Sequence, residues 1–348
     1  MTFILCPNTA VDRVLEVDAV RPGNTMRCRA LSEQAGGKGA NVARALRALG
    51  GASLLAGFAA GHNGRLIAEL ADDEWLEIEL VAIGGEARVS TVVLAADGPP
   101  THLFEHGPDI DAAAERALVA AAAARPARPG EWAIVDGAAP PGSSEGFYGA
   151  LCRALRTAGY HVMVDATGAQ LAGTLRERPD FVKVNLAEAC SAVGAEVGRP
   201  PAGAAFPAAG KTPAACADAE ATDGSGAGAA GPQGLAAAGL ELSRRLVAAG
   251  AGGAVVTLGP AGAAGLIDGG EWLVRTPPVQ AVNTVGSGDC FAAGLLLGFE
   301  RGDGTEAALR VAAGAAAANA ASARTGHFDL ALARDLAARA VAGAPATG

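Results

Sequence analysis

Short apolar segments alternate along this chain with stretches whose apolar residues recur at helical spacing. Strands are predicted at residues 2–6, 53–57, 89–95, 133–135, 161–165, 181–184 and 254–258. Helical spacing is found in residues 36–50, 67–72, 111–124 and 146–158. Strands that alternate with helices favour a mainly parallel sheet covered on both faces, so we predict an α/β fold. Open sheets of this kind bind their ligands at the carboxyl ends of the strands.

Two parts of the chain depart from this pattern. Residues 198–234 are dominated by Ala, Gly, Pro, Ser and Thr. Such a composition buries too little apolar surface to order itself, which predicts a flexible low-complexity insertion. Residues 341–348 are expected to form a disordered tail. Residues 1–340 would then make up a single domain.

Charge and composition exclude several classes of protein. A net charge of −9 without a basic stripe argues against nucleic-acid binding. The longest apolar runs are built from Ala, so no membrane span is expected, and the first residues lack a basic secretory signal, which predicts a cytoplasmic protein. The six cysteines form no CxxC pair, which favours reduced, buried thiols over a zinc site. A catalytic metal is therefore expected to have oxygen ligands.

The strongest motif is NTVGSGDCFAAGLLLGF, residues 283–299. Gly286, Ser287 and Gly288 directly precede an apolar helix, and such a turn presents free backbone N–H groups at the positive end of the helix, which suits a phosphate. Asp289 follows in the first helical turn. The motif predicts an anion site with a carboxylate base beside it, although an ordinary capped helix would also fit the local pattern.

A second glycine turn opens the helix predicted at residues 36–50. Here Gly36 and Gly37 precede Lys38 and Asn41, which place polar groups close to the helix start. The segment is not a P-loop, because GxxxxGK[ST] is absent. Two glycine-to-helix turns in one chain suggest two ligands, although this turn alone could be structural.

Acidic and amide side chains follow two further strands. Asp12 comes after the first strand, where a carboxylate could accept hydrogen bonds from the hydroxyls of a polyol. Asn185 and Glu188 stand three residues apart at a helix start and share one face, where they offer oxygen ligands to Mg²⁺. Taken singly, each of these residues would more often be a helix cap or a solvated side chain.

Together these motifs resemble those of the ribokinase-like (PfkB) carbohydrate kinase family. The matching pieces keep the family's order along the chain, at residues 8–12, 36–41, 140–142, 165–168, 183–188, 257–263 and 284–291. The GGKG form of the second piece looks most like the branch that contains 1-phosphofructokinase and tagatose-6-phosphate kinase. The resemblance implies a three-layer α/β fold with a small β-sheet lid, here from about residues 12–35 and 86–106. It also implies ATP and Mg²⁺ as cofactors, a sugar or sugar phosphate as acceptor, and a homodimer formed through the lid.

The resemblance also assigns roles to individual residues. Asp289 would be the catalytic base, with Gly286, Ser287 and Gly288 as the anion hole, and Asn185 and Glu188 would organise Mg²⁺. The nucleotide would be bound by Lys183, Thr257, Gly259, Gly262 and Asn319. The acceptor would be held by Asp12, Gly36, Gly37, Lys38, Asn41, Arg27, Arg88 and Asp136. Phosphoryl transfer needs positioning and charge stabilisation more than a strong base.

The acceptor end departs from the branch that it resembles. That branch usually has SGSLPPG, whereas residues 136–142 read DGAAPPG, so that Asp136 brings a negative charge toward the acceptor. The usual TRxN becomes ARVS at residues 87–90 and loses an amide. Three hypotheses therefore remain: a hexose-phosphate kinase like 1-phosphofructokinase, a kinase of an unphosphorylated sugar or polyol, or a catalytically idle binding protein. The intact GSGD and NxxE motifs favour a kinase over the idle protein.

Overall fold

A ten-stranded sheet forms the centre of the computed structural model, which describes residues 1–98, 100–194 and 231–345. Its strand order is β14-β13-β12-β11-β10-β9-β8-β1-β4-β5. The strands from β11 to β5 are parallel, and β12, β13 and β14 extend the sheet in antiparallel pairing. Their bounds are β1 Thr2–Leu5, β4 Ser53–Ala60, β5 Glu77–Ile83, β8 Trp132–Asp136, β9 His161–Asp165, β10 Phe181–Asn185, β11 Gly253–Thr257, β12 Ala263–Ile267, β13 Gly270–Arg275 and β14 Val341–Gly343.

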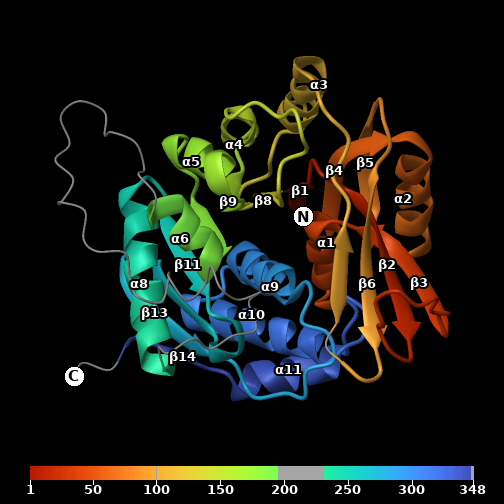
Figure 1. The fold of residues 1–348 in the computed structure, drawn as a ribbon. Helices are drawn as coiled ribbons and strands as arrows, with labels where there is room; N and C mark the ends of the chain where they lie inside the picture. Colours follow the sequence, from red (N-terminus) through yellow and green to blue (C-terminus); the bar gives the residue numbers. More distant parts are fainter. Residues whose placement is uncertain (99, 195–230, 346–348) are drawn as a thin grey trace.

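Helices cover both faces of this sheet, which gives three layers (Figure 1). One face carries α1 Lys38–Ala48, α2 Gly61–Asp73, α9 Ser287–Arg301 and α10 Thr305–Ala320, with α11 Leu330–Arg339 packed on α10. The other face carries α3 Ala112–Ala123, α4 Phe147–Thr157, α5 Gly168–Arg176, α6 Leu186–Gly194 and α8 Pro232–Ala248. In β1, Ile4 packs against the first group, whereas Phe3 and Leu5 pack against the second. This double burial explains why the central strands are apolar runs without alternation.

A second, four-stranded sheet contains the segments predicted as the lid. Its order is β3-β2-β6-β7, with bounds β2 Ala10–Val17, β3 Ala30–Gly36, β6 Arg88–Ala95 and β7 Thr101–Phe104. Strands β2 and β3 contact α2. Large apolar side chains remain exposed on this sheet, among them Leu31, Leu103 and Phe104.

The predicted α/β architecture is confirmed, while the predicted tail is wrong in part. Residues 341–343 are not disordered but form β14, which pairs with β13 at the sheet edge. A three-residue edge strand is held by backbone hydrogen bonds, so its side chains give little signal in the sequence. The predicted insertion lies mostly outside the described residues. The predicted insertion extends to residue 234, but α8 already begins at Pro232. Proline is favourable at the start of a helix, where its missing N–H would have no partner within the helix.

The sequence also predicts reduced, buried cysteines and no membrane span. Cys6, Cys152 and Cys290 are buried free thiols, as predicted, whereas Cys28 is free but exposed and Cys190 is disulfide-bonded. A disulfide needs no fixed spacing in the sequence, so the lack of CxxC did not exclude it. Among the described residues, no helix has the combination of length and apolar character that crossing a membrane requires.

Candidate active site

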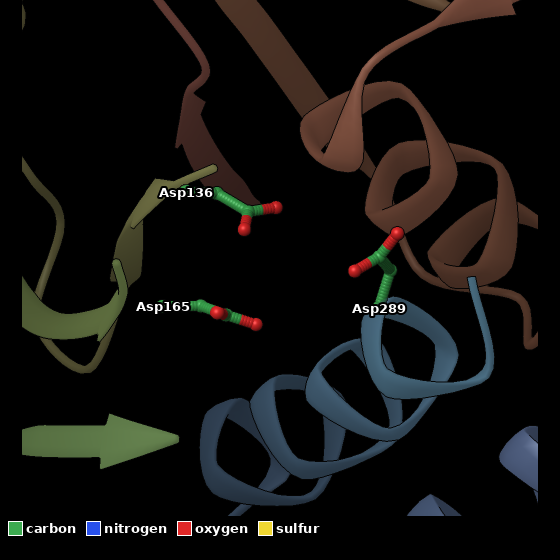
Figure 2. Close-up of side chains that lie close together, drawn as sticks. All are labelled: Asp136, Asp165 and Asp289. Carbon is green, nitrogen blue, oxygen red and sulfur yellow. The ribbon is translucent and has the colours of Figure 1, made fainter. Parts of the chain in front are cut away.

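Three aspartates from separate elements face one another at the carboxyl edge of the large sheet. Asp136 ends β8, Asp165 ends the neighbouring β9, and Asp289 lies in the first turn of α9. Figure 2 shows their carboxylates directed into the same space, and one oxygen from each lies within 4.8 Å of the others. All three side chains are buried. The topology therefore concentrates negative charge where an open α/β sheet binds its ligand.

The glycine turn before α9, predicted to be an anion site, begins with a left-handed residue. Gly286 has φ 74°, a left-handed conformation that favours glycine, and no side chain caps the helix. A Cβ at Gly288 would lie 2.9 Å from Lys183 Nζ, and one at Gly286 would lie 2.2 Å from Thr325 Cγ2. The Ser287 N–H donates to the Thr284 carbonyl at 3.2 Å. The N–H groups that follow it in the first turn lack partners within the helix, so they are the donors available to a phosphate oxygen.

Asp289 is held by an amide whose orientation is fixed from behind. Asn41 Nδ2 donates to Asp289 Oδ2 at 2.8 Å, and Arg44 donates to Asn41 Oδ1 at 3.1 Å. A guanidinium has only donors, so the Asn41 amide must turn its oxygen toward Arg44. Its NH₂ group then points toward Asp289. Burial raises the pKa of Asp289, while Lys38 and Lys183 act in the opposite direction. Asp289 thus has one amide donor and two nearby lysine charges, and burial increases its proton affinity.

Arg44 also connects this amide to the small sheet. Its guanidinium forms an ion pair with Glu74 at 2.5 Å and donates to the carbonyl oxygens of Ala35, at the end of β3, and Thr325. Burial alone would raise the pKa of Glu74, but neighbouring His327 and Arg44 lower it to about 2. The Asn41 amide that is bonded to Asp289 and strand β3 therefore share one partly buried ionic junction.

Two lysines neutralise one member of the aspartate cluster. Lys38 Nζ lies 2.8 Å from Asp165 Oδ1 and 3.2 Å from Glu188 Oε1, and Lys183 Nζ lies 2.5 Å from Asp165 Oδ2. Burial alone would raise the pKa of Asp165, but the charges and hydrogen bonds of Lys183 and Lys38 have the larger effect and lower it to about 2. Both oxygens of Asp165 are therefore engaged by cations.

Asn185 and Glu188, predicted to organise Mg²⁺, form a reciprocal cap at the start of α6. The Asn185 N–H donates to Glu188 Oε2, and the Glu188 N–H donates to Asn185 Oδ1, both at 2.8 Å. This pairing satisfies two backbone donors, as in a capping box. The Glu188 Oε1 atom contacts Lys38, so the pair lies beside the aspartate cluster.

Asp136 stands apart because neither of its carboxylate oxygens has a hydrogen-bond partner, although the residue is only 1% exposed. Burial and the nearby charges of Asp165 and Asp289 raise its pKa well above the usual range. Asn8 Oδ1 and Arg88 Nε are also buried and unpaired. The unpaired atoms thus belong to segments that the sequence assigned to the acceptor.

The other predicted acceptor residues occupy different positions. Asp12 lies on β2, and burial raises its pKa to about 6 although Arg44 and Arg88 oppose this. A Cβ at Gly36 would lie 2.3 Å from Asp12 Oδ1, which explains the glycine there. Arg88 donates to the Asn8 carbonyl and to Ser90 Oγ, both at 3.2 Å. Arg27 is exposed between β2 and β3, and among the described residues it forms no hydrogen bond or ion pair with the aspartate cluster.

Of the predicted nucleotide residues, Thr257, Gly259 and Gly262 lie at and after β11, Lys183 is in the cluster, and Asn319 lies on α10 against the glycine turn. Thr257 ends β11, which pairs with β10, and the turn after it contains Gly259 and Gly262 with φ 58° and 103°. Asn319 donates from Nδ2 to the Val285 carbonyl at 2.8 Å and to Ser287 Oγ at 3.0 Å, and its Oδ1 accepts from the Gly326 N–H. In this structure Asn319 braces the glycine turn.

Sequence reasoning missed two residues of this site as functional groups. Asp165 had a signal, because it ends a strand beside Asp136 and begins the DxTG piece at residues 165–168. Arg44 had a weaker one: it follows Asn41 by three residues on a helix and so shares its face. Its partner Glu74 comes from another helix, and no local spacing predicts that pairing.

Comparison with known proteins gives a family and a set of similar folds. The family model described as pfkB family carbohydrate kinase matches residues 1–219 and 227–330. Phosphofructokinase-2 from Escherichia coli, solved with potassium, is 23% identical with a TM-score of 0.79, over 97% of this chain and 98% of that one. A protein described as a possible 1-phosphofructokinase from Thermotoga maritima is 18% identical with a TM-score of 0.76, over 99% of both chains. At these identities, the structural matches establish the ribokinase-like fold alone.

Proposed function

The chain belongs to the pfkB family of carbohydrate kinases, and from that premise we propose that it transfers the γ-phosphoryl group of ATP to a hydroxyl of a sugar phosphate. Membership of the family makes it a phosphotransferase with a sugar hydroxyl as acceptor. The hexose-phosphate acceptor, as in 1-phosphofructokinase, is the specific part of the proposal.

The observation that carries this proposal is Asp289 beside the glycine turn. As the acceptor oxygen bonds to the γ-phosphorus and the bond to ADP breaks, the hydroxyl proton passes to Asp289. The turn formed by Gly286, Ser287 and Gly288 would bind the phosphoryl oxygens on which charge accumulates, through those of its N–H groups that have no backbone partner. Lys183 and Lys38 keep positive charge next to this space through their pairs with Asp165. These groups would position the reacting oxygen and phosphorus atoms and neutralise the phosphate charge. A loose phosphoryl-transfer transition state requires both.

The nucleotide and its metal would bind along β10 and β11. Thr257, Gly259 and Gly262 would contact ATP, with Lys183 close to its phosphates and Asn319 supporting the glycine turn. Asn185 and Glu188 fit Mg²⁺ by their chemistry, since both supply oxygen and Asn185 is exposed at the end of β10. Bound Mg²⁺ would neutralise phosphate charge, and the two residues would orient it mainly through water.

The acceptor would lie between Asp12, the turn at Gly36 and Gly37, and Asn41. A sugar phosphate needs a cation, and Arg88 suits this role, because it starts a lid strand and retains an unpaired Nε. Lys38 and, from the exposed lid connection, Arg27 would add positive charge. Escherichia coli phosphofructokinase-2 has been solved in complex with fructose-6-phosphate, which supports an acceptor of this class.

A second function is favoured by one observation, the unpaired Asp136. A buried carboxylate close to the acceptor would repel a phosphate but could accept hydrogen bonds from sugar hydroxyls. This supports an unphosphorylated sugar or polyol as the alternative acceptor.

We also propose that two copies associate through the small sheet, in the cytoplasm. Exposed Leu31, Leu103 and Phe104 give that sheet the apolar surface typical of an interface. Escherichia coli phosphofructokinase-2 has a tetrameric inhibited form, so assembly occurs in a related fold.

The test is ATP turnover by the purified protein against sugars and sugar phosphates, with Mg²⁺ present. Turnover of one hexose phosphate well above all free sugars supports the proposal, and the reverse order supports the alternative. Absence of turnover with every acceptor, while ATP still binds, would favour the idle binding protein.

A further inference from the structure

Arg44 is a buried arginine of α1 whose hydrogen bonds reach well beyond its ion pair. The residue is only 4% exposed, and its Nε donates to Glu74 at the end of α2. The other two nitrogens donate to the Asn41 amide and to the carbonyl oxygens of Ala35 and Thr325. Glu74 alone would neutralise the guanidinium charge. The remaining bonds therefore fix three groups in place, and each group adjoins the proposed active site.

The first group is the Asn41 amide, which is bonded to Asp289. An amide has two orientations that exchange its oxygen and nitrogen. With the nitrogen toward Asp289 it donates a hydrogen bond, whereas with the oxygen there it would face a carboxylate that can only accept. Arg44 selects the first orientation, because it offers a donor to the amide oxygen at 3.1 Å. Loss of this donor would leave both orientations open.

The second group is the Thr325 carbonyl, in the segment that packs on the glycine turn before α9. Arg44 donates to this carbonyl at 3.2 Å. The Thr325 side chain is so close to the turn that a Cβ on Gly286 would lie 2.2 Å from Thr325 Cγ2. The N–H of the next residue, Gly326, donates to Asn319, which is bonded to the same turn. Arg44 thus supports the proposed anion site from behind.

The third group is the Ala35 carbonyl, at the end of β3 and directly before the turn at Gly36 and Gly37. Arg44 donates to it at 2.6 Å. That turn is part of the proposed acceptor site. The donors of a guanidinium form a rigid planar fork, so their directions are fixed relative to one another. One side chain therefore links groups next to the base, the anion turn and the acceptor turn.

We propose that Arg44 is a positioning residue for phosphoryl transfer, which holds the Asn41 amide, the anion turn and the acceptor turn in one arrangement. It acts through Asn41 and two backbone carbonyls, since all three of its side-chain nitrogens are bonded to protein groups. The inference rests on the proposed role of Asp289 as the base. A misplacement of about 1 Å at a reacting centre can cost about 100-fold in rate, so the effect of Arg44 should appear in kcat.

The test replaces Arg44 by lysine, which keeps a charge beside Glu74 but loses the planar fork of donors. With ATP, Mg²⁺ and the acceptor of the panel above that is turned over fastest, kcat should fall about 10- to 100-fold. The KM for ATP should stay close to wild type. Arg47→Lys is the matched control, one turn further along α1. Arg47 is exposed, its side chain forms no hydrogen bond or ion pair among the described residues, and its variant should keep the wild-type kcat.

The pH profile of kcat/KM distinguishes positioning of the base from a merely structural role. Burial raises the pKa of Asp289, and the hydrogen bond from Asn41 lowers it. Arg44→Lys should release the amide and remove this lowering, so the acid limb of the profile should move to higher pH. A smaller folded fraction would reduce the rate at every pH and leave the limb in place. The charged groups that face Asp289 are unchanged in the variant: Lys38 on α1, Lys183 on β10, Asp12 on β2, Asp136 on β8 and Asp165 on β9.

Glu74→Gln separates stability from positioning. It removes the charge of the ion pair, but its amide oxygen can still accept from Arg44, so the acid limb should stay at its wild-type position. Thermal melting verifies that each variant is folded. If Arg44→Lys does not fold, the double variant Arg44→Met with Glu74→Leu removes both charges of the buried pair and should show the same fall in kcat and the same shift of the limb.

A folded Arg44→Lys variant with the kcat and acid limb of wild type would overturn the inference, and so would a loss of kcat with the limb unmoved. Asp289→Asn distinguishes this failure from failure of the proposed function. An inactive Asp289→Asn beside a normal Arg44→Lys would mean that Asp289 is the base and that Arg44 does not position it. Substantial turnover by Asp289→Asn would mean that the proposed base itself is wrong.

Discussion

The proposed phosphoryl-transfer end and the proposed acceptor end of this site differ in how completely their buried polar atoms are paired. At the transfer end, Asp289 is bonded to Asn41, Asn319 makes three hydrogen bonds around the glycine turn, and Lys183 is paired with Asp165. At the acceptor end, Asp136 and the Nε atom of Arg88 are buried without partners. One end is complete before any ligand binds, and the other is not.

This difference reflects what each end has to do. Charge stabilisation during phosphoryl transfer is effective when donors and cations are already oriented, so that nothing reorganises during the reaction. An unpaired buried polar group costs about 1–3 kcal/mol, which is recovered when a ligand supplies the partner. The unpaired atoms of Asp136 and Arg88 therefore support the position that we propose for the acceptor.

The largest effect is expected from Asp289→Asn at the completed end. Turnover should fall by about 100- to 10,000-fold, because a positioned base is lost, and nucleotide affinity should change little. Steady-state kinetics and nucleotide titration measure the two quantities. A variant that keeps more than about a tenth of the wild-type kcat would show that Asp289 is not the base.

The completed end should also depend on the ionic junction behind it. The pKa of Glu74 is lowered from 4.5 to about 2, which corresponds to about 3 kcal/mol of stability. For a carboxyl with a lowered pKa, that contribution is present above pH 4.5 and is lost as pH falls toward 2. Glu74→Gln should therefore lower the free energy of unfolding by roughly this amount at pH 7, with a smaller difference at pH 4, as measured by urea unfolding.

Glu241→Gln is the matched control for that junction. Glu241 pairs with Arg245 at an exposed site on α8, where an ion pair contributes only about 0–1 kcal/mol. Equal losses in the two variants would mean that burial adds nothing to the Glu74 pair.

The same contrast explains what the sequence could predict. Gly286 to Asp289 are consecutive, and Lys38 and Asn41 lie on one helical turn, so local spacing was enough to make them candidates, and the order of the motifs along the chain implied their roles. The bond between Arg44 and Glu74 joins α1 to α2, and the facing of Asp136 and Asp289 joins β8 to α9. Contacts of this kind depend on tertiary packing, which periodicity does not encode. Strand β14 escaped prediction for a related reason, since its pairing is made by backbone atoms.

At the acceptor end, Arg88→Ala tests whether a phosphate is bound there. If the acceptor is a sugar phosphate, its KM should rise about 10- to 100-fold, or roughly 1.4–2.8 kcal/mol, because Arg can grip a phosphate through two parallel hydrogen bonds. The KM for a free sugar should change much less. Equal effects on both acceptors would show that Arg88 supports the lid strand and does not recognise phosphate.

The smallest expected effect is on the free energy of unfolding, which the buried Asp136 carboxylate lowers when it is ionised and no ligand is bound. Its pKa is raised by burial and by Asp165 and Asp289, so the folded state keeps the proton to a higher pH than the unfolded state does. Stability should therefore decrease as pH rises above the usual carboxyl range, until Asp136 ionises in the folded protein as well. Asp136→Asn removes this penalty and should be more stable than wild type by about 1–2 kcal/mol at pH 8, with no advantage near pH 4. Urea unfolding in the presence of a chelator, from pH 4 to 8, measures the difference. For the control Asp72→Asn, at an exposed position in α2, the difference in free energy of unfolding from wild type should not change with pH. A difference between Asp136→Asn and wild type that does not change with pH would mean that the buried charge is not what distinguishes the acceptor end.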